Sequence, residues 1–181
     1  MAMQADRAST PNDHGSVTLE ALAARLAAWE DERAVVAVLT AYGHAIDAGD
    51  EAAWLDCFTD DARFSTSGAG RGRMAFDVSG RPALEDFVSR HSRRPHGFQE
   101  HLMLNPVIRF PATDEAHVVS RFLVLMRHEQ RPAIRAFGRY EDTLRREPGG
   151  TWRIVHRHAH IDGADDGLPR IAMVDPADVP W

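Results

Sequence analysis

The residues of this chain best suited to chemistry are a phenol, a carboxylate and an imidazole in apolar surroundings. Tyr42 and Asp47 lie in AYGHAIDAGD, near the end of an apolar helical pattern, and His101 stands among apolar neighbours in HLMLNP. A buried carboxylate needs a partner that compensates its charge. An imidazole that an aspartate orients can act as a general base near neutral pH. Spacing alone does not pair these residues, because each also suits an ordinary structural position.

Helix geometry separates the first two of these side chains. At about 100° per residue, Tyr42 and Asp47 lie about 140° apart on a regular helix. His44 and Asp47 are three residues apart and face each other better. A regular helix therefore predicts that Tyr42 and Asp47 point in different directions.

A second group of imidazoles lies near the C-terminus, in WRIVHRHAHI. His156, His158 and His160 occupy alternate positions, which a strand directs to one side. Three imidazoles on one face could bind a divalent metal. The intervening Arg157 adds positive charge, and the same pattern suits a solvated outer face or an interface, so we predict no metal. The single Cys57 lies beside aromatic residues, which favours a small core residue over a nucleophile.

The composition excludes several classes of function. A chain of 181 residues with 44% hydrophobic residues suits one packed domain. The net charge of -6 provides no basic field for nucleic acid or anionic lipid. All 21 basic residues are arginine, so lysine Schiff bases and Walker-type phosphate loops are impossible. With no long apolar stretch and a polar start, MAMQADRASTPNDHG, we expect a cytoplasmic protein outside the membrane.

The first half of the chain predicts helices. We expect a flexible arm at 1–16 and a long amphipathic helix that breaks near Glu30 and ends at Gly49. The apolar positions that define this helix are Leu19, Leu22, Leu26, Trp29, Val36, Leu39, Tyr42 and Ile46. Asp50 can cap a second helix that continues through Phe58. A loop or irregular hairpin is expected at 65–80, and Pro82 then suits the first turn of a third helix, which we expect to run through Leu84, Phe87 and Val88.

The second half predicts strands. LMLNPVIRF, AHVVSRFLVLMR, AIRAFGRYEDTLRR and TWRIVHRHAHI are β-branched and aromatic runs separated by turn signals. Four such runs predict an antiparallel meander. Helices followed by strands indicate an α+β fold with the helices on one face of the sheet. We place the domain at 17–162 and a C-terminal tail at 163–181.

The order of these elements resembles the SnoaL-like branch of the nuclear transport factor 2-like superfamily, which includes scytalone dehydratase. The resemblance covers about residues 28–162 and rests on YGHAIDAGD, WLDCFTDDARF, EHLMLNPVIRF, GRYEDTLRR and GGTWRIVHR. It implies a cone-shaped α+β barrel, in which a curved antiparallel sheet packs against N-terminal helices around an apolar pocket. It also implies an irregular helix end that lets Tyr42 and Asp47 both face inward.

The resemblance further implies roles for individual residues. Asp47 would orient His101 as the base, while Tyr42 and Arg157 would stabilise developing negative charge. The positions that would line the pocket are Trp54, Phe58, Phe64, Leu104, Phe122 and Phe137. No cofactor is implied, and the partner would be a small, mostly apolar molecule.

Several functions remain open from the sequence. The first expectation is a cofactor-independent lyase, such as a dehydratase, acting on a carbonyl-bearing or polycyclic substrate. The alternatives are an isomerase of the ketosteroid type, a noncatalytic ligand-binding module, and a small subunit of a ring-hydroxylating dioxygenase. The strand SRFLVLMR lacks the acidic residue that some catalytic relatives place there, which weakens the transfer of their reactions. The long insertion GAGRGRMAFDVSG is expected to close the pocket or change its shape, so substrate identity does not transfer. A homo-oligomer, dimer or trimer, is expected through the open side of the sheet.

Overall fold

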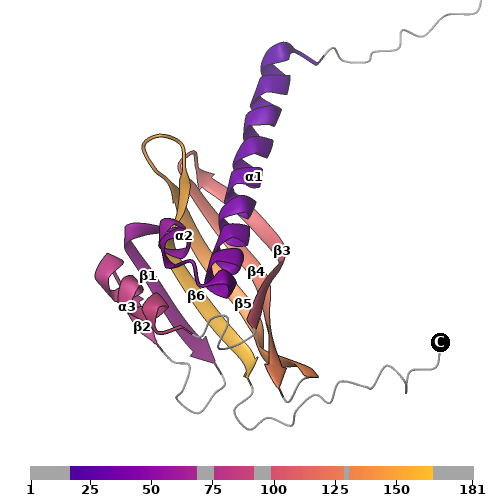
Figure 1. Cartoon of the computed structure of the whole chain (residues 1–181). Helices are drawn as coiled ribbons and strands as arrows, with labels where there is room; N and C mark the ends of the chain where they lie inside the picture. Colours follow the sequence, from indigo (N-terminus) through magenta and orange to yellow (C-terminus); the bar gives the residue numbers. More distant parts are fainter. Residues whose placement is uncertain (1–16, 69–75, 92–98, 129–130, 165–181) are drawn as a thin grey trace, which may run out of the picture.

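The structure is a computed structural model that describes residues 17–68, 76–91, 99–128 and 131–164. These residues form helices on one side of a single curved sheet (Figure 1). The helices are α1 (Leu19–Ala48), α2 (Glu51–Asp56) and α3 (Arg81–Ser89). The strands are β1 (Phe58–Gly68), β2 (Asp77–Ser79), β3 (Gln99–Ala112), β4 (Glu115–His128), β5 (Arg131–Arg146) and β6 (Trp152–Ala164).

The sheet has the order β2-β1-β6-β5-β4-β3. Strands β3 to β6 form the predicted antiparallel meander, and β1 pairs parallel with β6. The α+β prediction is confirmed, with a sheet that is curved but not closed within the described residues. The arm expected at 1–16 and residues 165–181 of the expected tail lie outside the described residues.

Helix α1 begins and ends at clear local signals. Thr18 accepts a hydrogen bond from the backbone N–H of Ala21 at 3.2 Å, and Gly49 ends the helix in the left-handed region with φ 72°. The break expected near Glu30 is absent. There Asp31 forms an ion pair with Arg146 of β5, which holds the continuous helix against the sheet.

The region after α2 differs from the prediction. Asp50 caps α2 as expected, but the helix ends at Asp56, and Phe58 begins β1. Strand β1 extends to Gly68 and pairs antiparallel with β2, so of the loop or irregular hairpin predicted at 65–80 the hairpin is formed. Its other partner, β6, lies about 90 residues later in the chain, at Phe64↔Arg157 and neighbouring positions. Local periodicity carries no information about such distant pairing.

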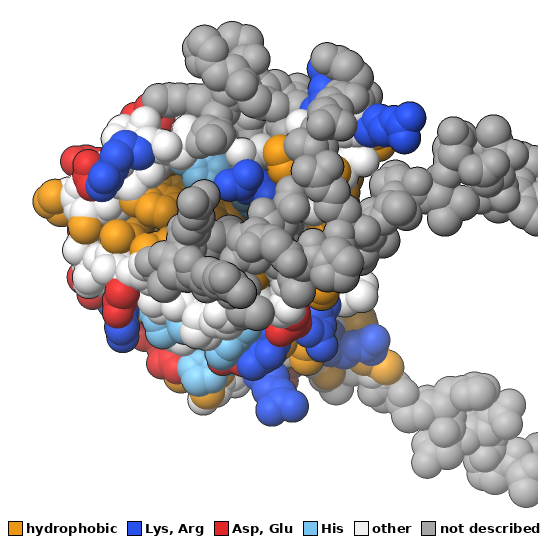
Figure 2. Space-filling view, turned by 90° about the horizontal axis from the view of Figure 1, so that it is seen from below, with side chains coloured by type: hydrophobic (Ala, Val, Ile, Leu, Met, Phe, Trp, Pro, Cys, Tyr) orange, Lys and Arg blue, Asp and Glu red, His pale blue; other side chains and the backbone are white. Residues whose placement is uncertain are grey.

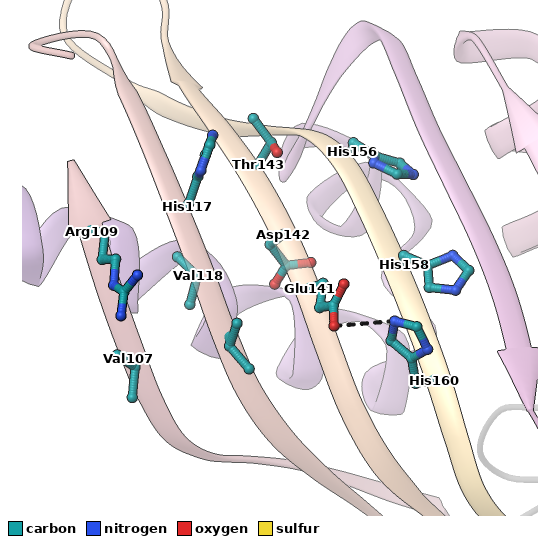
Figure 3. Close-up of a pocket in the computed structure, with 11 residues that line it drawn as sticks. Val107, Arg109, His117, Val118, Glu141, Asp142, Thr143, His156, His158 and His160 are labelled. Atoms are coloured by element: carbon teal, nitrogen blue, oxygen red, sulfur yellow. Dashed lines mark ion pairs between the residues drawn. The ribbon is translucent and has the colours of Figure 1, made fainter. Parts of the chain in front are cut away.

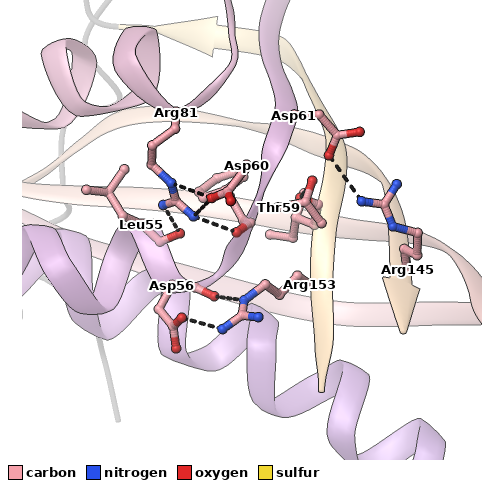
Figure 4. Close-up of polar contacts among 10 residues, drawn as sticks. Leu55, Asp56, Thr59, Asp60, Asp61, Arg81, Arg145 and Arg153 are labelled. Atoms are coloured by element: carbon pink, nitrogen blue, oxygen red, sulfur yellow. Dashed lines mark hydrogen bonds and ion pairs between the residues drawn. The ribbon is translucent and has the colours of Figure 1, made fainter. Parts of the chain in front are cut away.

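Arginine side chains hold the connection between α2 and β1 in place (Figure 4). Arg81, at the start of α3, donates to the carbonyl oxygens of Leu55 at 2.6 Å and Phe58 at 3.2 Å. Arg81 also bonds to Asp60, while Arg153 of β6 donates to the carbonyl oxygen of Asp56 at 2.9 Å. These contacts fix the corner at which the chain passes from the helices into the sheet.

The core lies between the helices and one face of the sheet. Helix α1 contributes Val35, Leu39, Tyr42 and Ile46, which recur at helical spacing. An aromatic cluster completes this core, and its buried members include Trp54, Phe58, Phe64, Phe122, Tyr140 and Trp152. The helix end that carries Tyr42 and Asp47 is therefore held against the sheet.

Candidate active site

A short and nearly buried polar contact between helix and sheet joins Asp47 of α1 to His101 of β3. Asp47 Oδ1 lies 2.6 Å from His101 Nδ1, and the backbone N–H of His101 donates to Asp47 Oδ2 at 2.7 Å. The two side chains are only 11% and 9% exposed, respectively. One carboxylate thus orients both the ring and its backbone. This arrangement favours a proton on Nδ1 and leaves Nε2 as the basic nitrogen.

A glycine in α1 allows this close approach. Gly43 and Asp47 are four residues apart and share the helix face that meets β3. A Cβ at Gly43 would lie 2.9 Å from the carbonyl oxygen of His101. Tyr42 and Ile46 face the core instead. Helix α1 is a regular α-helix from Leu19 to Ala48, without the irregular end that the resemblance implied. Tyr42 and Asp47 are both covered because the curved sheet packs against two sides of the helix.

Replacing Gly43 with alanine is expected to lower the free energy of unfolding by about 1–3 kcal/mol, because the added methyl overpacks the contact with β3. Helix propensity alone would make alanine stabilising by about 1 kcal/mol relative to glycine. A loss of stability would therefore come from the overpacked contact with β3. Urea denaturation measures the change. Thr40→Ala, at an exposed position of the same helix, is the control. A Gly43→Ala protein as stable as the wild type would contradict the close approach.

A second pair of charges lies in the interior, on β5 and β6. Arg157 Nε and Nη2 each donate to a carboxylate oxygen of Asp142 at 2.8 Å, and both side chains are 0% exposed. The guanidinium lies over the rings of Tyr42 and Tyr140, 4.0 and 4.3 Å from their centroids. Such stacking is favourable for a desolvated arginine. Arg157 is therefore neutralised by Asp142, an arrangement that the sequence did not predict.

The electrostatics of this cluster keep its hydrogen-bond donors protonated. Burial raises the pKa of Tyr42, and the Arg157 guanidinium only partly opposes the rise. Burial works to lower the pKa of Arg157, but the Asp142 carboxylate outweighs it and raises that pKa above its ordinary value. At neutral pH, Tyr42 is a neutral phenol and Arg157 is a cation.

Several buried donors in this cluster have no acceptor at full hydrogen-bond geometry within the part of the chain that the structure describes. They are Arg157 Nη1, Trp54 Nε1 and the Ser120 hydroxyl. Arg157 and Trp54 lie near enough to the Tyr42 hydroxyl to counteract the rise in its pKa. Trp54 and Arg157 both lie against Tyr42, with the Trp54 ring centroid 5.8 Å from that of Tyr42. A buried donor without an acceptor is costly, so an oxygen atom placed here would be stabilised.

The residues predicted to line a pocket fall into two groups. Trp54, Phe58 and Phe64 surround Tyr42, with ring centroids within 6.3 Å of its ring. Phe122 packs on Tyr140 at 4.5 Å. The other two face away from this core: Leu104 is 42% exposed and Phe137 is 39% exposed.

Ring contacts continue from this cluster to the base. Phe64 contacts Phe87 of α3 at 5.4 Å, Phe87 contacts His91 at 6.2 Å, and His91 contacts His101 at 5.6 Å. Aromatic side chains thus connect the neighbourhood of Tyr42 with the Asp47–His101 pair. This apolar environment is suited to a ligand of low polarity.

Two residues of the site were missed in the sequence, Tyr140 and Asp142. Both lie in GRYEDTLRR, at alternate positions of β5 that face the core. A carboxylate at a core-facing strand position is a signal that could have identified the partner of Arg157, because a buried charge requires pairing.

The three alternate histidines lie on the outer face of the sheet, away from the helices. They border a cleft of about 690 Å³ that extends from Arg109 of β3 to β6 (Figure 3). His158 is held between Ser65 and Ser67, each at 2.7 Å, and His160 pairs with Glu141 at 3.2 Å. Burial and the neighbouring His160 and His156 lower the pKa of His158. Asp47 and His101 do not line this cleft.

The outer face shows no metal centre. Within the described ranges, no group of three or more His, Cys, Asp or Glu side chains is arranged to hold a metal ion. Figure 2 shows histidine side chains gathered on the surface beside arginine and exposed hydrophobic side chains.

The part of the chain that the structure describes also contains no helix of sufficient length and apolarity to cross a membrane.

A curved, mostly antiparallel sheet, unclosed within the described residues and packed against a long N-terminal helix, with an Asp–His pair where the two meet, defines a class of α+β proteins. The sequence profile of the SnoaL-like domain matches residues 27–158. The chain belongs to the SnoaL-like domain family. No curated protein matches the chain.

Solved structures share this fold. A nuclear transport factor 2-like protein with a cystatin-like fold from Novosphingobium aromaticivorans is 23% identical, with TM-score 0.68, over 85% of this chain and 94% of that one. A proposed scytalone dehydratase from the same organism is 21% identical, with TM-score 0.63, over 82% and 98%. The beta subunit of a proposed aromatic-ring-hydroxylating dioxygenase, also from that organism, is 22% identical, with TM-score 0.64, over 75% and 92%.

Proposed function

We propose that this protein is a cofactor-independent lyase that eliminates water or a related leaving group from a small, mostly apolar carbonyl compound. The observation that carries the proposal is the Asp47–His101 pair, with its 2.6 Å contact and its nearly buried side chains. A histidine held in one tautomer by a carboxylate is a common general base. The fold shared with a proposed scytalone dehydratase agrees with this chemistry.

The proposed reaction uses the basic nitrogen of the dyad. His101 Nε2 takes a proton from the carbon next to the carbonyl, and the C–H electron pair becomes the enolate. The enolate then forms a C=C bond as the leaving hydroxyl departs, and that hydroxyl receives the proton from His101 to become water. Asp47 stabilises the imidazolium between these two steps.

The interior donors supply the electrostatic part of the proposal. Tyr42 and the unpaired Nη1 of Arg157 would donate hydrogen bonds to the substrate oxygen, where negative charge develops in the enolate. Trp54 Nε1 is a further buried donor next to Tyr42. Because Asp142 neutralises the charge of Arg157, Arg157 would act mainly through the hydrogen bond that its Nη1 donates, and less through its net charge.

An isomerase uses the same base. If no leaving group is present, the proton on His101 can return to another carbon of the enolate, and the double bond moves. The dyad therefore supports elimination and isomerisation equally at the first step, which is proton abstraction.

One observation favours a noncatalytic function as the second candidate. Arg157 and Asp142 are joined by two hydrogen bonds and are both fully buried, as expected of an ion pair with a structural role in a core. In that case the protein would resemble the beta subunit of a dioxygenase, and Asp47–His101 would only join α1 to β3. In either case we expect a small molecule or a protein as partner, no nucleic acid and no membrane, and a homo-oligomer in the cytoplasm.

Proton abstraction can be tested before the natural substrate is known. The protein is incubated in D2O with a panel of cyclic ketones, β-hydroxyketones and hydroxylated aromatic ketones, and NMR follows exchange at the carbon next to the carbonyl and loss of water. We expect exchange above the buffer rate for at least one compound and its loss in His101→Gln. No exchange with any compound would favour the noncatalytic function, whereas exchange that persists unchanged in His101→Gln would assign proton abstraction to another group and remove His101 from the proposed reaction.

A further inference from the structure

A row of large apolar side chains lies exposed along the N-terminal half of α1. Leu19, Leu22, Leu26 and Trp29 are 84%, 46%, 53% and 59% exposed. This half of the helix extends beyond the sheet, with no described element beside it (Figure 1). Single exposed apolar residues are normal, but a continuous row of four indicates an interaction surface. We name these four residues the α1 stripe.

The α1 stripe is not a continuation of the protein's own core. Helix α1 packs into that core through Val35, Leu39, Tyr42 and Ile46. At 100° per residue, the mean direction of the stripe differs by about 150° from the direction of these core residues. Towards its own domain, the same half of the helix presents Asp31, which pairs with Arg146. The stripe therefore faces away from the described part of the domain, and no described residue covers it.

The spacing of the stripe identifies the kind of partner. Steps of three and four residues join its members and continue through Arg33 and Val36 to give a 3-4-3-4-3 series. This series is the a and d pattern of a coiled coil, whose partner is another helix. From Leu19 to Val36 the pattern covers 18 residues, or about 27 Å of helix.

We propose that the α1 stripe binds the α1 stripe of a second copy of this chain in an antiparallel helix pair. In the register that uses the whole series, Leu26 of each copy meets Trp29 of the other, and Leu19 meets Val36. The remaining layer joins Leu22 to Arg33, whose aliphatic stem covers the leucine while its charged end reaches solvent. The pair has two-fold symmetry, so each contact occurs twice.

The charges beside the stripe agree with this orientation. In the antiparallel register, Arg25 of each copy lies opposite Glu32 of the other, at the flanking positions that set partner choice in coiled coils. A parallel pair in register would instead bring the two Arg33 side chains together. It would also place both domains at the same end of the pair. The antiparallel pair places the domains at opposite ends.

This interface is independent of the proposed activity and distinct from the open face of the sheet. It is at the small end of specific interfaces, so we expect the dimer to dissociate on dilution. Sedimentation velocity of the full chain over a range of concentrations tests this expectation. The variant Leu22→Glu/Leu26→Glu should be monomeric and keep the native circular dichroism spectrum, because the stripe lies outside the core. The control Ala27→Glu, exposed on another side of the same helix, should still dimerise.

Disulfide cross-linking then tests the orientation. The natural Cys57 is buried, and we expect the double variant Arg25→Cys/Glu32→Cys to form covalent dimers on oxidation. The single variants should not, because in this register the two copies of position 25 lie about 8 Å apart along the helix axis and the two copies of position 32 about 14 Å apart, whereas positions 25 and 32 lie about 3 Å apart. A monomeric wild type, a Leu22→Glu/Leu26→Glu variant that still dimerises, or a double cysteine variant that does not cross-link would each overturn the proposal. Activity in the deuterium-exchange assay does not enter any of these outcomes.

Discussion

Replacing His101 with glutamine is expected to lower the rate of substrate deuterium exchange about 10²–10⁴-fold, which is the usual contribution of a positioned general base. Glutamine keeps a similar size but has no basic nitrogen, so it can fill the position between α1 and β3 without accepting a proton. The measurement is the exchange rate by NMR on the compound that the wild-type protein turns over. Binding of that compound should change much less than the rate, since the lost interaction belongs to the chemical step.

Two further variants separate the base from its support. Asp47→Asn should also slow exchange, because an amide does not stabilise the imidazolium, and its rate should show an altered pH profile. His44→Gln is the matched control, since His44 lies exposed on the same helix. A His44→Gln protein as slow as His101→Gln, or a His101→Gln protein with wild-type exchange, would remove His101 from the proposed reaction.

Replacing Asp142 with asparagine is expected to lower the free energy of unfolding by about 3–5 kcal/mol, the typical cost when one partner of a buried ion pair is removed. Arg157 is fully buried and lies over the rings of Tyr42 and Tyr140, so its charge would remain without a carboxylate to compensate it. Denaturation in urea, followed by circular dichroism, measures the change. The slope of the transition should stay the same if the fold is intact.

The surface provides a matched control for this pair. Arg63 and Asp77 form an ion pair that is 53% and 54% exposed, and Asp77→Asn should change stability little, because solvent screens such a pair. In the double variant Asp142→Asn/Arg157→Met the uncompensated charge is gone, so part of the lost stability should return. An Asp142→Asn protein as stable as Asp77→Asn would show that the interior is more hydrated than the structure indicates.

The sequence by itself determined the features that depend on neighbouring residues. Gly49 ends α1, Asp50 caps α2 and Pro82 lies in the first turn of α3, each as predicted. These signals act within a few residues, because a cap or a fixed backbone angle is a local property. The meander of β3 to β6 was also predictable, since its turns join strands that are consecutive in the chain.

The pairing of Asp47 with His101 was predicted from the family resemblance, and the spacing of the two residues in the sequence did not predict it. The two residues are 54 positions apart, and no local pattern relates them. Only the tertiary structure shows how Tyr42 and Asp47 are both covered: the sheet curves around α1, so core-facing and β3-facing sides of one regular helix are both packed. Gly43 makes this possible through its close approach to β3.

The tertiary structure alone decided the rest of the site. It paired Arg157 with Asp142, placed Leu104 and Phe137 on exposed positions, and joined β1 to β6 in parallel. It also showed that the apolar residues of α1 serve two purposes, with the later ones in the core and the earlier ones facing outward. Helical periodicity predicts that a side chain lies on an apolar face. Which surface covers that face depends on contacts between distant parts of the chain, or between chains, and these arise only on folding and assembly.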